Sequence, residues 1–319
     1  MSIIKKQEAL SKAAKISLQK AYQKCLLCGC KEFNIRYDFG KHRILYCTDC
    51  KFMWLYPQPT KLDLQSVYNE NYFHNHNFFL DNNKSIYGYY DYISERFNKQ
   101  SQFQDVLDEI TDMLDDFKPG KLRYLDIGCG LGYMLDIAHD RGFEVEGVEF
   151  NSYAVEKIRS KYTFPVFNGD IIDFPGRNFD VVSMFDVIEH LTDPLRAVSK
   201  VRGILNPQSL FILTTTDCDS IVSRLLGKNL EDFRRIREHL FFFNRDNIRI
   251  LLERAGFEVI ETRFYGHTFR LDFLASRIKM MSPCIGDVLL KVLRYLHISN
   301  SNLYINPFTK MIVFSRPNN

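Results

Sequence analysis

The feature that most constrains this 319-residue chain is a glycine-rich turn over residues 124–132, Tyr-Leu-Asp-Ile-Gly-Cys-Gly-Leu-Gly. A short apolar run that ends at Asp126 indicates a buried strand, and the apolar pattern from Tyr133 onward indicates a helix. Glycines let backbone N–H groups approach a ligand, and a helix N-terminus carries partial positive charge. The third glycine follows the second by two residues, so the dinucleotide fingerprint of dehydrogenases is the poorer fit. The pattern predicts a nucleotide-binding α/β fold, with a structural tight turn as the alternative.

Acidic residues end the strands that we predict after this turn. Glu149 ends a strand over 143–149 and lies 23 residues after Asp126. An acid about 20 residues past the glycine turn holds ribose hydroxyls in this class of fold, because a carboxylate accepts from both hydroxyls. Asp170 and Ile171 follow a short third strand at 166–167, and Asp186 ends a fourth at 179–186. Further strands are predicted at 210–214, 257–262 and 311–315, and helices at 151–162 and 195–205.

Two Glu-His pairs are candidates for acid–base chemistry. The fourth strand runs into Glu189 and His190, and the carboxyl ends of strands are where ligands bind in open α/β sheets. The second pair is Glu238 and His239, and three arginines precede it. A solvated basic face is the simpler interpretation of those arginines, which are Arg234, Arg235 and Arg237.

The cysteines predict a metal site near the N-terminus. Cys25 and Cys28 form one Cys-x2-Cys pair, and Cys47 and Cys50 form another after eighteen intervening residues. Two such pairs can supply a tetrahedral shell of four thiolates around zinc. Four protein ligands leave no open position, so we expect Zn²⁺ to be structural, with free thiols in a core as the alternative.

Three other segments shape the expected organisation. Residues 1–24 predict a frayed amphipathic helix, and 93–117 predict a long helix. The stretch 73–92 is crowded with aromatic residues, which favours either a loop that closes over a substrate or a packed linker. An amphipathic helix at 285–296 is expected to pack against the core, with a lid, a dimer face or a membrane-surface contact as alternatives.

The composition of the chain bears on nucleic-acid binding and on cellular location. The net charge of +3 is too small to indicate nucleic-acid binding. No apolar run reaches the length of a transmembrane helix, and the N-terminus has no apolar signal core. We therefore expect a cytoplasmic protein.

With these residues in view, the chain resembles bacterial class I S-adenosylmethionine (SAM) methyltransferases that carry an N-terminal zinc ribbon. Such proteins are often linked to surface-polysaccharide and deoxysugar pathways. The resemblance spans most of 25–315 and is carried by the ribbon with residues 56–59 and 68–73, by the core motifs at 126–132, 149 and 186–194, and by 238–243 ahead of 255–257. Sugar C-methyltransferases of this kind tend to have tyrosine where this chain has Ile236, which argues against C-methylation.

The resemblance implies an α/β architecture with a Rossmann-like, seven-stranded methyltransferase sheet. It divides the chain into an N-terminal helix at 1–24, a zinc ribbon with its exit segment at 25–75 and a SAM methyltransferase domain at 76–319. The implied cofactors are SAM and structural zinc. The expected SAM-binding residues are Asp126, Gly128, Gly130, Gly132, Glu149, Asp170, Ile171 and Asp186.

The expected reaction is methyl transfer to a small acceptor, a sugar or nucleotide-linked sugar, on oxygen or nitrogen more readily than on carbon. His239, oriented by Glu238, is the first candidate for the base, and His190 is the second. The three arginines are expected to bind phosphate on the acceptor, because guanidinium groups pair with phosphate oxygens. The alternatives are an RNA methyltransferase that reads its substrate with the ribbon, and a non-catalytic partner subunit that retains the SAM fold.

Overall fold

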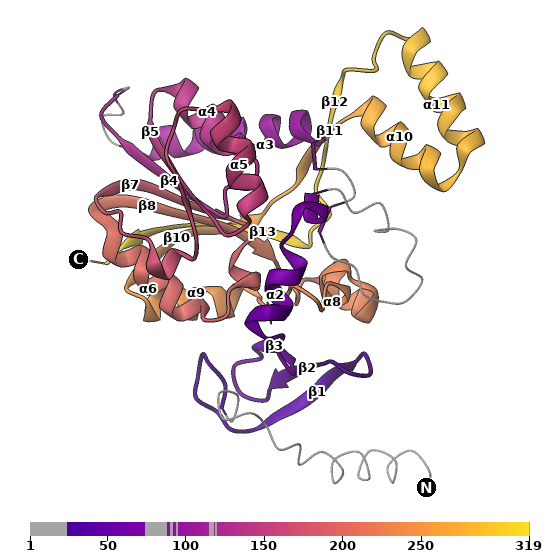
Figure 1. The fold of residues 1–319 in the computed structure, drawn as a ribbon. Helices are drawn as coiled ribbons and strands as arrows, with labels where there is room; N and C mark the ends of the chain where they lie inside the picture. The colour runs from indigo at the N-terminus through magenta and orange to yellow at the C-terminus, as the bar shows by residue number, and fades with distance from the viewer. Residues whose placement is uncertain are drawn as a thin grey trace, which may run out of the picture.

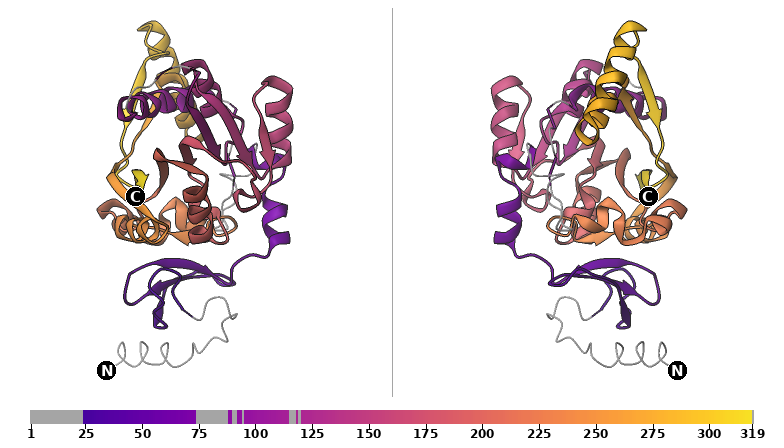
Figure 2. Two further views of the ribbon diagram at one scale, coloured as in Figure 1. Left: turned by 90° about the vertical axis from the view of Figure 1, so that its left-hand side faces the viewer. Right: turned by 90° about the vertical axis from the view of Figure 1, so that its right-hand side faces the viewer.

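The computed structural model describes residues 24–73, 88–89, 92–93, 95–114, 118 and 120–318. A twisted sheet with helices on both faces forms the body of the molecule, with a small sheet at one end and a helical hairpin at the opposite end (Figures 1 and 2). The helix that the sequence predicts over 1–24 lies outside the described residues, apart from Lys24, and so does most of 73–92. None of the described helices is both long and apolar enough to span a membrane.

The central sheet has seven strands, as the sequence predicts, and all but β13 run parallel. From one edge to the other the strands are β10 (Phe257–Phe264), β13 (Lys310–Pro317), β8 (Leu205–Thr216), β7 (Phe179–Phe185), β4 (Arg123–Ile127), β5 (Glu144–Glu149) and β6 (Val166–Asn168). The inner strands are nearly continuous apolar runs because helices cover both of their faces. The fold is therefore the Rossmann-like, seven-stranded α/β architecture that the resemblance implies.

Helices divide between the two faces of this sheet (Figure 1). One face is covered by α3 (Arg96–Met113), α4 (Tyr133–Arg141) and α5 (Ser152–Lys161), and the other by α6 (Pro194–Ile204) and α9 (Arg245–Arg254). Side chains cap α5 and α6 at their N-termini: Asn151 accepts from the N–H groups of Tyr153 and Ala154 at the start of α5, and Asp193 accepts from the N–H of Arg196 at the start of α6. Each face thus buries its own apolar cluster against the strands.

Short elements fill the connections. They are α2 (Lys61–Val67), η2 (Glu70–Phe73), η3 (Ile171–Asp173), η4 (Ile188–His190), α7 (Ile221–Leu226), η5 (Gly227–Asn229) and α8 (Glu231–Arg234).

The cysteine-rich segment forms the small sheet. Its strands are β1 (Phe33–Asp38), β2 (Arg43–Cys47), β3 (Met53–Tyr56) and, from far along the chain, β9 (Phe241–Phe242). Trp54 of β3 pairs with Phe241 of β9, and the ring of Phe52 stacks on Phe241 with centroids 5.6 Å apart. The apolar side chains of the segment also join the cluster beneath α6 and α9. The segment is therefore built onto the body and does not hang from it by a linker.

The helical hairpin is an insertion between the last two strands of the sheet. Strands β11 (His267–Arg270) and β12 (Asn302–Ile305) pair as a two-stranded stalk. The stalk carries α10 (Leu271–Met281) and α11 (Pro283–Tyr295), which pack on each other away from the body (Figures 1 and 2). The sequence predicts the second of these helices, but expects it against the core.

Candidate active site

A cavity of about 390 Å³ opens at the carboxyl ends of the central strands. Ile127, Val148 and Phe185, which lie at or next to the ends of β4, β5 and β7, contribute to its wall. It lies where ligands bind in open α/β sheets. Of the eight residues expected to bind the cofactor, seven line this cavity: Asp126, Gly128, Gly130, Glu149, Asp170, Ile171 and Asp186. Gly132 instead lies at the N-terminus of α4, against Ile158.

The glycine turn needs glycine for a steric reason. Gly128 has a φ of +72°, which L side chains rarely adopt, and a Cβ there would lie 2.3 Å from a methyl carbon of Val187. The N–H of Gly130 donates to a carboxylate oxygen of Glu149 at 2.8 Å. Gly128 and Gly130 therefore bring backbone atoms to the cavity surface.

Two buried carboxyl groups face each other at this end of the cavity. Glu149 accepts from the N–H groups of Gly130 and Asn151, and Asp126 accepts from the hydroxyl of Ser183 at 2.6 Å. Burial raises the pKa of each carboxyl group to about 7, although these hydrogen bonds oppose the rise. Carboxyl groups left buried with spare acceptor capacity are suited to a ligand that brings hydroxyl or amine donors.

Asp170 and Asp186 line the same cavity in different states. Asp170 caps the short η3 helix by accepting from the N–H of Ile172 at 2.9 Å. Asp186 accepts from the hydroxyl of Thr214 at 2.9 Å and is ion-paired with Lys310. Burial alone would raise the pKa of Asp186, but the Lys310 ammonium outweighs it and holds that pKa well below its usual range. Asp186 is therefore a fixed negative charge in the cavity wall.

His190 lines the cavity and is held in one orientation. Its Nδ1 lies 3.1 Å from the carbonyl oxygen of Glu238 and 2.9 Å from the hydroxyl of Tyr68. A carbonyl oxygen can only accept and a tyrosine hydroxyl can also accept, so both contacts are compatible with the tautomer that has the proton on Nδ1 and the lone pair on Nε2. Burial lowers the pKa of His190, and the carboxylate of Glu238 only partly offsets this. The side chain is thus a neutral, oriented base.

Glu238 and His239, the pair that the sequence favours for catalysis, lie behind this wall. His239 is 4% exposed, and its ring centroid is 4.7 Å from that of His190, but it does not line the cavity. Glu238 is fully buried and pairs with Arg235 at 2.9 Å, whereas the Nδ1 of His239 faces Asp232 at 3.5 Å. The expectation that Glu238 orients His239 is therefore corrected: chain neighbours point to different partners.

The three arginines do not line the cavity either. Arg235 is buried, and its guanidinium bonds to Glu238, Glu231 and the carbonyl oxygen of Gly88. Arg234 is half-buried and Arg237 exposed. Arg235 was expected to bind phosphate, but its guanidinium instead forms ion pairs and a hydrogen bond within the protein.

A different cation lines the cavity. The ammonium of Lys99, on α3, lies 5.3 Å from the ring centroid of Tyr89 and 4.9 Å from that of Tyr92. Burial lowers the pKa of Lys99, although Glu95 and Asp186 oppose this. Nearby, the Nδ1 of His267 lies 3.2 Å from the amide oxygen of Gln102, and both side chains line the cavity. This end of the cavity therefore combines aromatic walls with a few polar groups.

Comparison with known proteins assigns this chain to a protein family. Residues 70–262, more than half of the chain, match the methyltransferase domain family. The chain belongs to that family. It is 31% identical over 156 residues to a probable SAM-dependent methyltransferase of Mycolicibacterium smegmatis, covering 48% of this chain and 58% of that protein. It is 26% identical over 160 residues to the ubiquinone biosynthesis O-methyltransferase of Cereibacter sphaeroides, covering 44% of this chain and 62% of that protein.

Solved structures include a SAM-dependent methyltransferase from Archaeoglobus fulgidus, with a TM-score of 0.47 and 18% identity over 69% of this chain and 94% of its own. The matches to the curated relatives span about three fifths of those proteins' lengths.

The cavity of this methyltransferase-family chain fits SAM in its donor set. Gly128 and Gly130 line the cavity with backbone atoms, and Glu149 is a buried carboxylate at the end of the strand next to the turn. Asp170 and Ile171 follow β6, one strand further. These residues are the ones that would hold the nucleoside.

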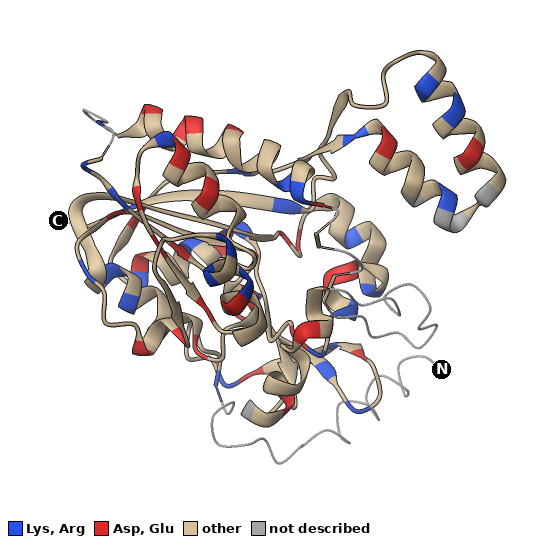
Figure 3. Cartoon of the chain, turned by 45° about the horizontal axis from the view of Figure 1, so that its top comes forward, with Lys and Arg blue, Asp and Glu red and all other residues tan. Residues whose placement is uncertain are grey.

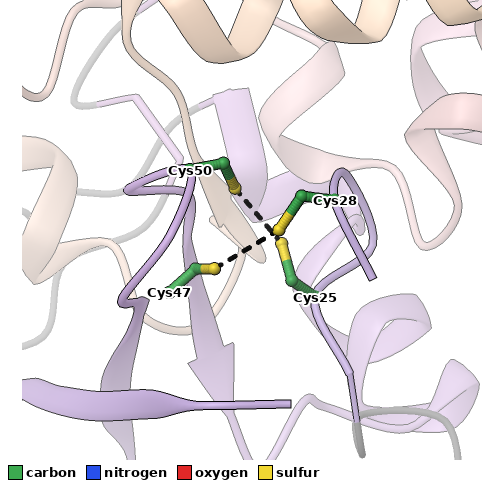
Figure 4. Close-up of side chains that lie close together, drawn as sticks. All are labelled: Cys25, Cys28, Cys47 and Cys50. Atoms are coloured by element: carbon green, nitrogen blue, oxygen red, sulfur yellow. Dashed lines mark hydrogen bonds between the residues drawn. The ribbon is translucent and has the colours of Figure 1, made fainter. Parts of the chain in front are cut away.

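Two side-chain clusters in the described chain are close enough to bind a metal ion. One is the set of four cysteines, in which the Sγ atoms of Cys25 and Cys50 are 3.4 Å apart and those of Cys28 and Cys47 are 3.5 Å apart (Figure 4). The other consists of Glu189, His190 and His239. Tetrahedral thiolate geometry is typical of structural zinc, so the cysteine cluster fits that ion.

Sequence reasoning missed many of the residues that line the cavity beyond the strand ends. The lining residues that it did not single out include Lys99, Gln102, Thr214, Tyr265 and His267. Tyr89 and Tyr92 belong to the aromatic stretch 73–92 that was proposed as a loop over the substrate. The others carry no local signal, because they come from a helix, a strand end and the stalk.

Proposed function

We propose that this protein transfers the methyl group of SAM to an oxygen or nitrogen of a small acceptor, a sugar or nucleotide-linked sugar, in the cytoplasm. The observation that supports this most is that one cavity is lined by two chemically different groups of residues, which we call its cofactor end and its acceptor end. One end has the glycine turn and Glu149, and the other has the neutral base His190 and the cation Lys99. A cofactor and an acceptor in one cavity are held close together, and such positioning can supply about 7–11 kcal/mol of the barrier.

At the cofactor end, bound SAM supplies a methyl group that its sulfonium already activates. Glu149 would accept from the ribose hydroxyls, and Asp170 with Ile171 would face the adenine. Gly128 and Gly130 would present backbone atoms to the bound cofactor.

At the acceptor end, His190 would take the proton of the acceptor hydroxyl. The carbonyl oxygen of Glu238 holds the proton on Nδ1, which keeps Nε2 available as the basic atom. Its lowered pKa keeps the imidazole unprotonated at neutral pH. We therefore propose His190 as the general base, a role for which the sequence favours His239 first.

Lys99 would bind an anionic group of the acceptor. The ammonium of Lys99 lies over the rings of Tyr89 and Tyr92. A phosphate or carboxylate of the acceptor would add a charge-assisted hydrogen bond to this ammonium. Aromatic walls suit the apolar faces of a sugar ring, and the polar groups of Gln102 and His267 suit its hydroxyls. The sugar class itself rests only on the resemblance to zinc-ribbon methyltransferases of surface-polysaccharide and deoxysugar pathways, and Ile236 favours oxygen or nitrogen over carbon.

We also propose that residues 25–75 are a structural zinc module that supports the methyltransferase domain at 76–319. Its four thiolates would fill the coordination shell, so zinc would stabilise the fold and take no part in the reaction. Metal analysis of the purified protein should find one zinc ion per chain, and a metal-free, fully folded protein would remove this assignment.

The reaction can be tested with SAM that carries a labelled methyl group. We would incubate it with the protein and with separated lysate fractions of nucleotide sugars, polysaccharide and lipid, RNA, and protein. Label in the sugar or polysaccharide fraction supports the proposal. Label in RNA would assign the protein to RNA methylation, and no SAM binding at all would support a non-catalytic partner subunit.

A further inference from the structure

The α10–α11 hairpin carries an apolar face that no described part of the chain covers. The hairpin stands on the β11–β12 stalk at the edge of the molecule, away from the central sheet (Figures 1 and 2). Along α11 and the residue after it, the exposed apolar side chains recur at intervals of one helical turn: Ile285 (57% exposed), Val288 (60%), Val292 (46%), Tyr295 (85%) and Leu296 (53%). That spacing places them on one stripe of the helix.

The stripe is the outer half of a wider apolar face. Leu289, Leu290 and Leu293 are half-buried on the other side of α11, where α10 packs. Gly286 lets the two helices approach closely, because a Cβ there would lie 2.2 Å from the Cα of Lys279. The covered half therefore fixes the hairpin, and the exposed half has no structural task within the described chain.

The charges beside the stripe are mainly positive. Asp287 is ion-paired with Lys279 at 2.7 Å, which neutralises the one carboxylate of α11. Lys291 and Arg294 remain as exposed cations on the same helix. Figure 3 shows blue segments, which mark Lys and Arg, along the hairpin. An exposed apolar stripe with flanking cations is typical of helices that lie in the plane of a membrane surface.

We propose that the α10–α11 hairpin docks on an anionic membrane surface. The apolar stripe would enter the boundary between headgroups and acyl chains, with Tyr295 at the interface and the ammonium of Lys291 among the lipid phosphates. A second copy of the chain suits this face less well. A two-fold contact uses the same patch on both copies and would bring the cations of both into one interface, whereas anionic headgroups complement them.

The position of the stalk links this surface to the cavity. His267, the first residue of β11, lines the cavity, so the stalk that carries the hairpin begins at the cavity wall, where the acceptor would bind if the proposed function holds. Docking would hold this end of the cavity near the lipid surface. The docking proposal does not depend on which molecule is methylated.

Vesicle flotation tests the proposal with the full-length protein. We expect binding to vesicles of phosphatidylcholine with phosphatidylglycerol, and little binding to phosphatidylcholine alone. Lys291→Gln and Arg294→Gln should each lower the partition coefficient about five-fold, since a cation near an anionic surface contributes on that scale. The double variant Val288→Asp/Val292→Asp should abolish binding, because it places charge in the buried stripe.

Leu225→Asp is the matched control, since Leu225 is 81% exposed on α7, far along the chain from the hairpin. It should float like the unchanged protein, and all variants should keep the same melting temperature. Equal binding of the double variant, or no binding to either vesicle, would overturn the proposal. So would a wild-type dimer in solution that the double variant converts to monomers, because that result assigns the stripe to a second copy.

Discussion

The two ends of the cavity are built in different ways. The cofactor end consists of strand ends, backbone N–H groups and carboxylates from one continuous stretch, residues 126–186. The acceptor end gathers side chains from distant segments, among them Tyr68, Lys99, Thr214 and His267. The first depends on backbone geometry that the sheet imposes, whereas the second depends on side chains that can change without altering the sheet. Substitutions at the acceptor end should therefore change kinetics more than folding.

The two ends of the cavity also differ in how burial changes the pKa values of their ionisable groups. Burial raises the pKa of Asp126 and Glu149 to about 7 at the cofactor end. At the acceptor end burial lowers the pKa of His190 and Lys99, so the imidazole is neutral there. The imidazole should affect the rate of methyl transfer, whereas the two carboxyl groups should affect the affinity for SAM. The two ends of the cavity can therefore be tested by separate measurements.

The largest expected effect separates chemistry from cofactor binding. His190→Ala should lower kcat by about 10²–10⁴-fold and leave SAM affinity unchanged, because the variant removes the base and no cofactor contact. Stopped assays of methyl transfer, with isothermal titration for SAM, measure the two quantities. His239→Ala is the comparison variant, and it should keep kcat per SAM-binding molecule. The reverse pattern would restore His239 as the base.

A smaller effect is expected on acceptor binding. Lys99→Met should raise the acceptor KM by about 10- to 150-fold, the range that corresponds to loss of a hydrogen bond to a charged group. Lys157→Met is a matched control, because the ammonium of Lys157 lies 5.1 Å from the ring centroid of Tyr153, outside the cavity lining. Initial rates over a range of acceptor concentrations measure KM. An unchanged KM in the Lys99 variant would mean that the acceptor carries no anion at this place.

The smallest effect concerns pH at the cofactor end. The ionised form of Glu149 is the acceptor of hydroxyl groups, and its pKa in the free protein is about 7. SAM affinity should therefore be constant above pH 7 and fall as pH decreases below it, by at most about tenfold per pH unit. Calorimetric titrations of the protein with SAM, at a series of pH values above and below 7, measure this dependence of the affinity on pH. Glu149→Gln should bind weakly at all pH values and flatten the curve, and a steep acid decline that survives this variant would assign the titration to Asp126.

The sequence predicted the central sheet well. The strands expected at 143–149, 179–186, 257–262 and 311–315 correspond to β5, β7, β10 and β13 within a few residues. Apolar runs of this kind are buried on both faces, so the pattern is strong. The helix expected at 93–117 forms as α3 over Arg96–Met113, and that expected at 285–296 forms as α11.

Long-range pairing was outside the reach of local patterns. The two-residue strand β9 pairs with β3, and the side chain of Asn247 donates to the carbonyl oxygen of Cys50 at 2.7 Å. These contacts join residues about 190 positions apart. A two-residue strand has no periodicity of its own, because only its partner defines it.

By itself, the sequence determined the fold class, the glycine turn and the carboxylates at the strand ends. It could do so because the cofactor end is made of neighbours in the chain, and strand periodicity fixes where each strand stops. Only the tertiary structure decided that His190 and not His239 lines the cavity, that Lys99 joins it, that Arg235 forms internal ion pairs, and that the α11 stripe faces outward. The physical reason is that a side chain's partners are set by packing among segments far apart in sequence, which adjacency along the chain does not encode.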